Sequence, residues 1–237
     1  MERLNKVLAH AGIASRRKAD KLIARGHIKV NGKVITEYGI KVAGNDEIEV
    51  NGIPIFKEDK VYFVIFKPKG VITSVSDEHK RKTVMDYFKH IKQRIYPVGR
   101  LDWDTSGILL MTNDGDFAHQ MMHPKHEIEK VYIAKIHGLA DKENLRPLTY
   151  GIKIDGKKTN FAHYEILHVN TKKRVSIVKL TINEGRNHQV KKMFEAINLP
   201  VQKLKRESYG TLNLTGLKPG EYRAISKKER RSLLKMI

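Results

Sequence analysis

The chain has 237 residues, no cysteine and a formal net charge of +20. The lack of cysteine excludes disulfides, thiolate metal sites and a cysteine nucleophile, and it fits a reducing compartment. No apolar run reaches the roughly 20 residues of a membrane span, and the first residues lack the apolar core of a signal peptide. We therefore expect a soluble protein of the cytoplasm.

Lysine and arginine occur in nearly every segment, so the positive charge is not confined to a tail. A polyanion is the natural partner, because each neutralised phosphate releases counterions. An anionic membrane surface would also attract such a chain, but no amphipathic helix with a large exposed apolar face is evident. We expect the protein to bind nucleic acid and not membranes.

The first 55 residues predict two small helices and a few strands. One helix opens at Leu4 and stops at Gly12, and the second follows the N-cap residue Ser15 and stops at Gly26. The strands are joined by two Asn-Gly pairs, a sequence typical of tight type I′ hairpins. These pairs are Asn31-Gly32 and Asn51-Gly52.

Basic side chains gather at the start of the second helix, namely Arg16, Arg17, Lys18 and Lys21. A helix N-terminus carries a positive dipole end, so this cluster suits phosphate. The segment resembles the alpha-L motif, a small RNA-binding module of a ribosomal protein and of bacterial tyrosyl-tRNA synthetases. The residues that carry this resemblance are 3–6, 11–12, 14–20, 22–23, 26, 28 and 30–32. The resemblance implies contact with folded RNA, which we assign to Arg3, Asn5, Lys6, Ser15, Arg16, Arg17 and Lys18.

A charged strip at 56–60 separates two apolar runs, and we interpret it as a linker between domains 1–55 and 61–237. In the larger domain, strands outnumber helices and several antiparallel hairpin signals occur. We predict an α+β fold with a mixed, mainly antiparallel sheet flanked by helices. Strands are expected at 61–66, 71–74, 108–112, 130–136, 152–154, 164–169, 175–182 and 201–205. Helices are expected at 83–89, 116–122, 141–148 and 226–236, and a glycine-hinged basic loop that enters a helix is expected at 183–194.

A polar loop at 96–107 carries Arg100, Asp102 and Asp104 directly before the buried strand 108–112. Loops that project polar groups from a rigid strand often carry chemistry. The structural alternative is a hairpin connection whose aspartates bond their own backbone.

Several kinds of enzyme do not fit this loop. An aspartic protease needs a second acidic loop, and a magnesium nuclease needs further carboxylates, but the chain has neither. Ser106 lacks the glycine two residues before it that a nucleophile elbow requires, and no phosphate-binding glycine loop is present. His119, His123 and His126 have partial metal-ligand spacing, but Pro124 interrupts their helix, so we expect no metal site.

What remains is an acidic side chain in a basic, RNA-binding protein. A carboxylate beside cations can act as a nucleophile or a base. The candidates to supply the positive charge are Arg100, Arg186, Lys191 and Lys192. Tyr132, on a predicted strand, is a candidate to stack on a base removed from its helix.

At this point the motifs resemble a family. Segments 99–102, 105–110 and 112–115 are similar to the signature of the RsuA/RluB group of ribosomal RNA pseudouridine synthases, and 66–71, 130–132 and 184–196 agree in order and spacing. With the N-terminal module, the resemblance covers essentially the whole chain.

The resemblance implies a cofactor-free isomerisation of uridine to pseudouridine within ribosomal RNA. Asp102 would be the catalytic aspartate, whether it adds to the sugar, adds to the base or promotes elimination. Tyr132 would stack on the target base, and Lys191, where the family often has arginine, would pair with Asp102 without a two-pronged geometry. Arg100 would take the place of the flipped base. The expected RNA contacts of this domain are Arg100, Arg186, His188, Gln189 and Lys192.

Within the family, the chain looks most like the RluB branch. This resemblance implies that the substrate is the 23S RNA, either free or in a pre-ribosomal particle. It also implies that the enzyme is a monomer. The alternative is an RsuA-like enzyme that acts on 16S RNA. A third hypothesis is a non-catalytic assembly factor that binds RNA, but the presence together of Asp102, Tyr132 and Lys191 argues against it.

Overall fold

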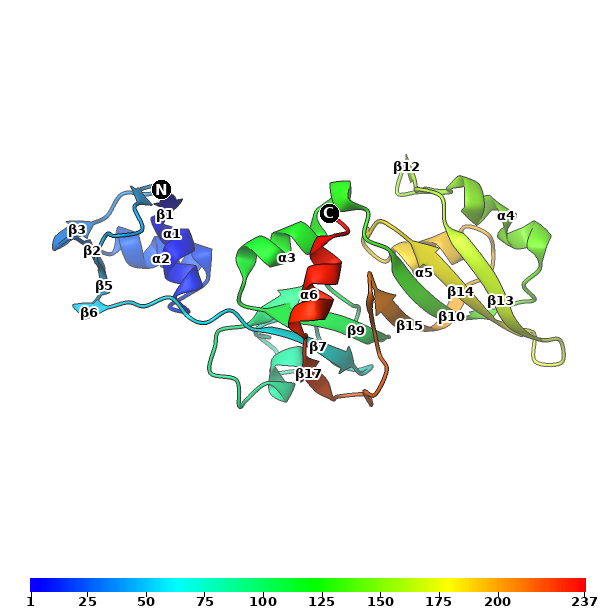
Figure 1. Ribbon diagram of the computed structural model, residues 1–237. Helices are drawn as coiled ribbons and strands as arrows, with labels where there is room; N and C mark the ends of the chain where they lie inside the picture. The colour runs from blue at the N-terminus through cyan, green and yellow to red at the C-terminus, as the bar shows by residue number, and fades with distance from the viewer. The chain divides into compact units, whose positions relative to one another are not determined.

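The computed structural model describes all 237 residues, and their contacts divide the chain into two compact units (Figure 1). The first unit contains residues 1–61 together with the segments 90–95 and 112–115. The second contains residues 62–89, 96–111 and 116–237. Residues 56–60 form neither helix nor strand. The boundaries at 55 and 61 stay a prediction.

The first unit packs two helices against short strands. Helix α1 spans Leu4–His10 and α2 spans Arg16–Ala24, and the Ser15 side chain caps α2 by accepting a hydrogen bond from the Lys18 backbone N–H at 3.3 Å. Both helices and both hairpins are confirmed. The strands are β1 (Glu2–Arg3) paired with β4 (Lys41–Val42), and a sheet of β3 (Lys33–Ile35), β2 (Ile28–Val30), β5 (Ile48–Val50) and β6 (Ile53–Pro54) in that order.

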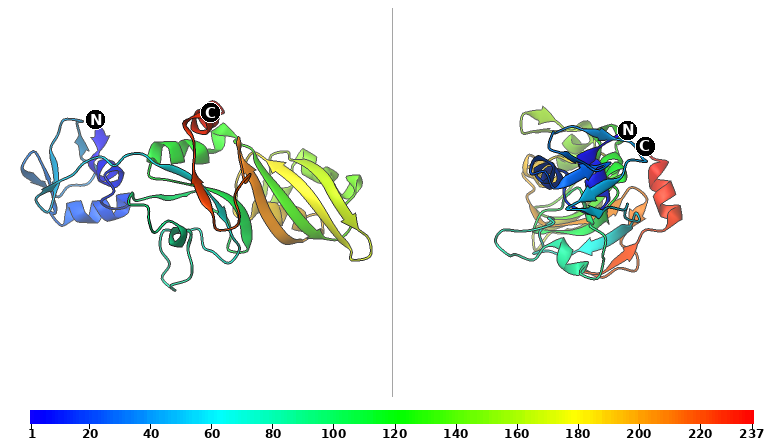
Figure 2. Two further views of the ribbon diagram at one scale, coloured as in Figure 1. Left: turned by 60° about the horizontal axis from the view of Figure 1, so that its bottom comes forward. Right: turned by 90° about the vertical axis from the view of Figure 1, so that its left-hand side faces the viewer.

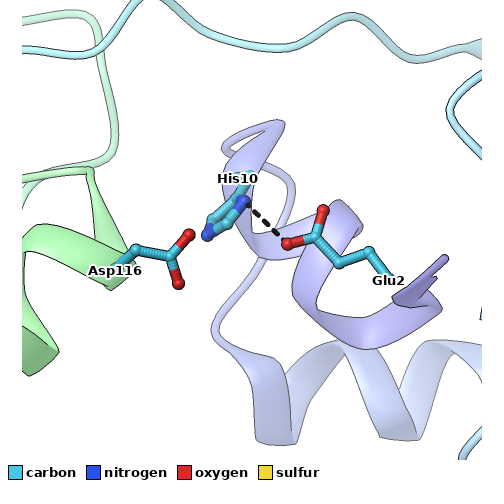
Figure 3. Close-up of side chains that lie close together, drawn as sticks. All are labelled: Glu2, His10 and Asp116. Atoms are coloured by element: carbon cyan, nitrogen blue, oxygen red, sulfur yellow. Dashed lines mark ion pairs between the residues drawn. The ribbon is translucent and has the colours of Figure 1, made fainter.

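Apolar side chains of both helices form the core of this unit, which includes Leu4, Leu8 and Ile23. Charged contacts also tie β1 to α1. The Glu2 Oε1 atom lies 2.9 Å from Lys6 Nζ and 3.7 Å from His10 Nδ1, and Figure 3 shows the second contact. These contacts join the first strand to the first and last turns of α1.

The second unit is built on one mixed sheet, as predicted. Its strand order is β13-β14-β10-β15-β9-β7-β17, with β8 against β9 and β16 against β15. Strand β10 runs antiparallel to β14 and β15, whereas β15 runs parallel to β9. The strands are β7 (Tyr62–Lys67), β8 (Tyr96–Val98), β9 (Thr105–Thr112), β10 (Lys130–His137), β13 (His163–Asn170), β14 (Val175–Ile182), β15 (Val201–Tyr209), β16 (Leu212–Asn213) and β17 (Tyr222–Ala224).

Helices flank this sheet at both ends. Figures 1 and 2 show α3 and α6 next to each other over β7 and β9, and their side chains share one apolar core with β9. Helices α4 and α5 lie against the other half of the sheet, at β13 and β15 (Figure 1). The helices are α3 (Gly115–Met122), α4 (Lys142–Tyr150), α5 (Gln189–Glu195) and α6 (Lys227–Leu234), with 3-10 turns at Val84–Tyr87 and Pro124–His126 and a small hairpin of β11 (Lys153–Ile154) and β12 (Lys157–Lys158).

The parallel contact between β9 and β15 depends on a glycine. Gly107 has φ of +128°, and a Cβ atom there would lie 2.3 Å from the Arg206 carbonyl oxygen, which no side chain tolerates. Arg206 in turn donates from Nε and Nη2 to the Ile108 carbonyl oxygen at 2.9 and 2.8 Å. The strand that follows the 96–104 loop is therefore held firmly on one side.

Three sequence predictions in this unit need correction. The helix expected at 83–89 is only a 3-10 turn at Val84–Tyr87. The strand expected at 71–74 is wrong, because only Ile72 forms a bridge, with Thr83, while the Val71 carbonyl accepts from the Lys67 side chain. Strand β15 runs on to Tyr209 rather than ending at Lys205, because Arg206 and Tyr209 are buried. None of the helices is long and apolar enough to cross a membrane.

Candidate active site

The loop that carries Asp102 is fixed by the segment that follows β7. The Thr73 hydroxyl donates to the Leu101 carbonyl at 2.7 Å and accepts from the Leu101 N–H at 3.2 Å. The Gly70 N–H donates to the Trp103 carbonyl at 2.8 Å. Backbone groups on both sides of Asp102 are thus bonded to residues 70–73, which hold the loop in place.

A cation from helix α5 joins the two aspartates of this loop. Lys191 Nζ donates to Asp102 Oδ2 at 2.9 Å and to Asp104 Oδ1 at 2.6 Å. Lys191 therefore contacts one oxygen of each carboxylate instead of both oxygens of Asp102. Asp104 therefore shares the cation of Asp102.

The electrostatics of this group follow from its partial burial. Burial works to lower the pKa of Lys191, but the hydrogen bonds to Asp104 and Asp102 outweigh it and raise that pKa above its usual value. For Asp104, burial works to raise the pKa, but the hydrogen bond from Lys191 and the charges of Lys191 and Lys69 together outweigh it, so the pKa is lowered. Lys191 thus keeps its charge throughout the physiological range.

His188 approaches the other side of the Asp102 carboxylate. Its Nε2 atom lies 3.4 Å from Asp102 Oδ1, on the oxygen that Lys191 does not contact. His188 adopts a left-handed conformation, with φ of 52°, at the N-cap of α5. This backbone geometry turns the imidazole toward the 96–104 loop, a role that the sequence pattern did not indicate.

Asp102, Lys191 and Tyr132 line one small pocket of about 70 Å³. Tyr132 is buried on β10, with 9% of its surface exposed. Arg100 lies at the same pocket, is exposed, and makes no hydrogen bond or ion pair. The structure therefore brings together, at one place, four side chains that were predicted from motifs up to 91 residues apart in the chain, Arg100 and Lys191 being the most distant.

Other predicted RNA contacts hold the loop after β14 instead. Arg186 donates to Glu184 at 3.0 Å and to the carbonyls of Lys157 and Lys158 at 3.2 and 2.7 Å. Gln189 is 4% exposed, and its amide bonds Glu184 at 2.6 Å and the Arg186 N–H at 2.9 Å.

Lys192 also helps to hold the loop after β14, because its Nζ atom lies 2.5 Å from Asp155 in the β11–β12 turn. For Gln189 the prediction of direct RNA contact needs correction, since both ends of its amide are occupied inside the protein. Arg186, Gln189 and Lys192 together fix the loop and the start of α5, and so they fix Lys191.

In the first unit the predicted RNA contacts divide into two groups. Asn5 donates to Asp20 at 2.9 Å, Lys6 pairs with Glu2, and Ser15 caps α2, so these side chains serve internal contacts. The others are exposed and available to a ligand, namely Arg3, Arg16, Arg17 and Lys18.

Lys67, which the sequence analysis did not assign to the site, is completely buried beneath it. Its Nζ atom donates to the carbonyls of Pro68 and Val71 at 2.9 and 2.8 Å. Burial lowers the pKa of Lys67 to about 8, although the nearby Asp102 and Asp104 charges work to raise it. A lysine at the end of an apolar strand, just before a proline, was the signal that could have revealed it.

The three histidines with partial metal spacing form edge-to-face contacts with one another. The ring centroids of His119 and His123 are 5.3 Å apart, and those of His123 and His126 are 5.8 Å apart. Their ligand atoms do not converge within 4.8 Å as a group. His123 Nδ1 instead accepts a hydrogen bond from the Lys125 N–H at 3.3 Å.

Comparison with known proteins agrees with this fold. The model of the RNA pseudouridylate synthase family matches residues 61–196, and that of the S4 domain matches residues 2–48. The chain therefore belongs to the RNA pseudouridylate synthase family and carries an S4 domain at its N-terminal end.

Particular relatives extend over nearly the whole chain. The ribosomal large subunit pseudouridine synthase B of Bacillus subtilis is 57% identical over 97% of this chain and 94% of its own length. An uncharacterized RNA pseudouridine synthase of Aquifex aeolicus is 37% identical over 99% of this chain and 94% of its own. A crystal structure of a pseudouridylate synthase superposes with a TM-score of 0.71 at 32% identity, covering 98% of this chain and all of the other.

Proposed function

We propose that this chain isomerises a specific uridine of large-subunit ribosomal RNA to pseudouridine, with Asp102 as its catalytic carboxylate. The observation that carries the proposal is the convergence of Asp102, Lys191 and Tyr132 in one pocket. The 57% identity to the Bacillus subtilis large-subunit enzyme supports the choice of RNA.

In this reaction the bond between C1′ of the ribose and N1 of uracil breaks, the base turns, and a bond from C1′ to C5 forms. The proton on C5 is then released, and N1 takes up a proton, so that the product is an isomer of uridine. Asp102 either adds to the sugar, adds to the base or assists an elimination. Lys191 orients the carboxylate through one oxygen, which leaves the other oxygen toward His188 and the pocket.

The target uridine must leave its helix to reach Asp102, which costs a few kcal/mol. Tyr132 provides an aromatic face in the pocket on which the flipped uracil stacks, and such stacking contributes about 1–3 kcal/mol. Arg100, which has no partner in the protein, fills the gap that the base leaves in the RNA. Its guanidinium is planar and stacks well on the neighbouring bases.

The exposed basic side chains of α2 would dock folded RNA and so raise the local concentration of substrate. We further propose that the enzyme works as a monomer in the cytoplasm, on free RNA or on a pre-ribosomal particle. A 16S substrate is the alternative within the family.

Tritium release from uridine labelled at C5 tests the proposal. Ribosomal RNA from cells that lack the enzyme is labelled, and its large-subunit and small-subunit molecules are assayed separately. Wild type is expected to release tritium from the large-subunit RNA only, and Asp102→Asn is expected to bind this RNA and to release none. Release from the small-subunit RNA alone would show that the substrate is wrong, and an active Asp102→Asn variant would show that the mechanism is wrong.

A further inference from the structure

A second cleft adjoins the pocket of Asp102. It has a volume of about 400 Å³, against about 70 Å³ for the pocket itself, and Arg100 and Tyr132 line both. A cleft of this size is large enough to hold a small ligand or part of a larger one. The roles of Asp102, Lys191 and Tyr132 in the proposed reaction leave this space unexplained.

Two cations lie deep in this cleft, on adjacent strands. Lys130 on β10 is opposite Tyr209 on β15, and Tyr132 is opposite Arg206. Arg206 is 4% exposed. Lys130 and Arg206 both lie over the Tyr209 ring, with Nζ at 5.3 Å and the guanidinium carbon at 5.2 Å from its centroid.

Neither cation is paired with a carboxylate. Lys130 Nζ donates to the Ile128 carbonyl at 2.7 Å, and Arg206 donates to the Ile108 carbonyl. The nearby acid is Glu184, and its oxygens are already bonded by Arg186 and Gln189. Two further N–H groups of Lys130, and one nitrogen of Arg206, are left without a protein partner.

Such an arrangement is unfavourable unless an anion completes it. Burial and the charge of Arg206 together lower the pKa of Lys130 to about 8, against the opposing effect of Glu184. Like charges that are buried together and unpaired cost free energy. A phosphate between them would offset that cost with charge-assisted hydrogen bonds.

We propose that Lys130 and Arg206 bind a backbone phosphate of the substrate RNA, one that lies next to the flipped uridine. This inference rests on the proposed function, because the uridine defines where the strand runs. Lys130 and Tyr132 are two residues apart on β10, so both project from the same face of the sheet. A strand whose base stacks on Tyr132 therefore passes over Lys130, which favours a phosphodiester over a free anion.

The test uses full-length protein and large-subunit ribosomal RNA purified from cells that lack the enzyme. Lys130→Met keeps the length of the side chain and removes its charge. We expect it to reduce the slope of log Kd against log salt by about one and to raise KM about tenfold, with kcat within about twofold. Lys130→Arg is expected to restore both quantities.

The matched control is Lys135→Met, on the same strand but on the opposite face, which should leave the salt slope and KM unchanged. A folded Lys130→Met variant with the wild-type slope and KM would overturn the proposal. So would a loss of kcat alone, which indicates that Lys130 only positions Tyr132.

A further arm measures binding of inorganic phosphate alone by calorimetry. Phosphate binding that depends on Lys130, while the Lys130→Met variant keeps the wild-type dependence of RNA binding on salt, would show that the cleft takes a free anion and would overturn the RNA contact.

The slope of log Kd against log salt is measured without turnover. A wild type that releases no tritium from this RNA therefore contradicts the proposed function and leaves the phosphate contact separately measurable.

Discussion

At the scale of single residues, the site depends on how one lysine is shared between two carboxylates. Lys191 contacts Asp104 at 2.6 Å and Asp102 at 2.9 Å, and Asp104 is the more exposed of the two, with 56% of its side chain accessible against 29%. Water screens an exposed ion pair strongly. We therefore expect the contact with Asp102 to matter for catalysis and that with Asp104 mainly to orient the lysine.

Substitution of Lys191 tests this reading. Lys191→Met removes the only cation bonded to Asp102 at less than 3 Å, and we expect kcat to fall about tenfold to a hundredfold, which corresponds to about 1.4–2.8 kcal/mol. Lys191→Arg retains the charge and should keep kcat within about threefold. Single-turnover tritium release measures both. An equal loss in the two variants would indicate that shape, and not charge, is needed at this position.

The buried Lys67 predicts a specific dependence of stability on pH. Lysine in an unfolded chain titrates near pH 10.4, whereas burial lowers the pKa of Lys67 in the folded protein to about 8. Between these two values the unfolded state binds more protons, so the free energy of unfolding rises with pH. Below pH 8 the cost of the buried charge is present in full, and above about pH 10.4 it is absent.

Lys67→Met removes this titration, and it also leaves the carbonyls of Pro68 and Val71 without their donor. The second effect is the same at every pH. We therefore expect the variant to be more strongly destabilised relative to wild type at pH 10 than at pH 7, as measured by urea unfolding. Other titrating groups are common to both proteins and cancel. A difference in stability that stays constant between these pH values would contradict the assigned titration.

At the scale of elements, Thr73 couples the segment after β7 to the catalytic loop. Thr73→Val keeps the shape of the side chain but loses both hydrogen bonds to the Leu101 backbone. Leaving those two groups unpaired costs about 1–3 kcal/mol, and a small displacement of Asp102 lowers the rate strongly. We expect kcat to fall about tenfold or more, whereas Thr73→Ser, which keeps the hydroxyl, stays within about threefold. A Thr73→Val variant with wild-type kcat would show that the loop carrying Asp102 keeps its conformation without the Thr73 hydrogen bonds.

The same segment shows why part of the fold was not predictable. Periodicity identified the helices α1, α2 and α3 and the strands β10 and β14, because their apolar faces are regular. Residues 71–74 have the apolar character of a strand, but the Val71 carbonyl accepts from the buried Lys67 side chain and the Thr73 hydroxyl bonds the distant Leu101 backbone. Strand β15 contains the buried Arg206, a residue that sequence patterns assign to the surface.

Motifs predicted the candidate site better than periodicity did. Asp102, Tyr132 and Lys191 could be named because their motifs occur in the expected order, and the structure brings them to one pocket. The supporting residues could not be named in this way. Arg186 and Gln189 have the chemistry of RNA ligands, and only their partners, Glu184 and the β12 backbone, show that these side chains make contacts within the protein.

At the scale of the whole molecule, the charge of +20 is distributed over both units, so general attraction to RNA does not by itself require a docking surface. What distinguishes α2 is that Arg16, Arg17 and Lys18 are all exposed at the helix start, where the dipole adds to their charge. A surface that contacts RNA phosphates directly contributes to the salt dependence of binding in proportion to the contacts it makes. The salt dependence of RNA binding therefore distinguishes direct phosphate contacts at α2 from general attraction to the whole molecule.

Replacement of Arg16, Arg17 and Lys18 by alanine removes three charges and leaves the Ser15 cap and the buried face of α2 intact. We expect the slope of log Kd against log salt to fall by about two to three for large-subunit ribosomal RNA, because each lost phosphate contact contributes about 0.7–0.9 to that slope. The rate at saturating RNA should stay within about twofold, since the pocket of Asp102 is untouched.

The control variant replaces Lys29, Lys33 and Lys41 by alanine. These lysines are exposed on strands of the same unit, so this variant removes the same charge. If both triple variants lose the same slope, the attraction is diffuse and α2 is not the docking surface; a loss confined to the α2 variant assigns the contact to that helix.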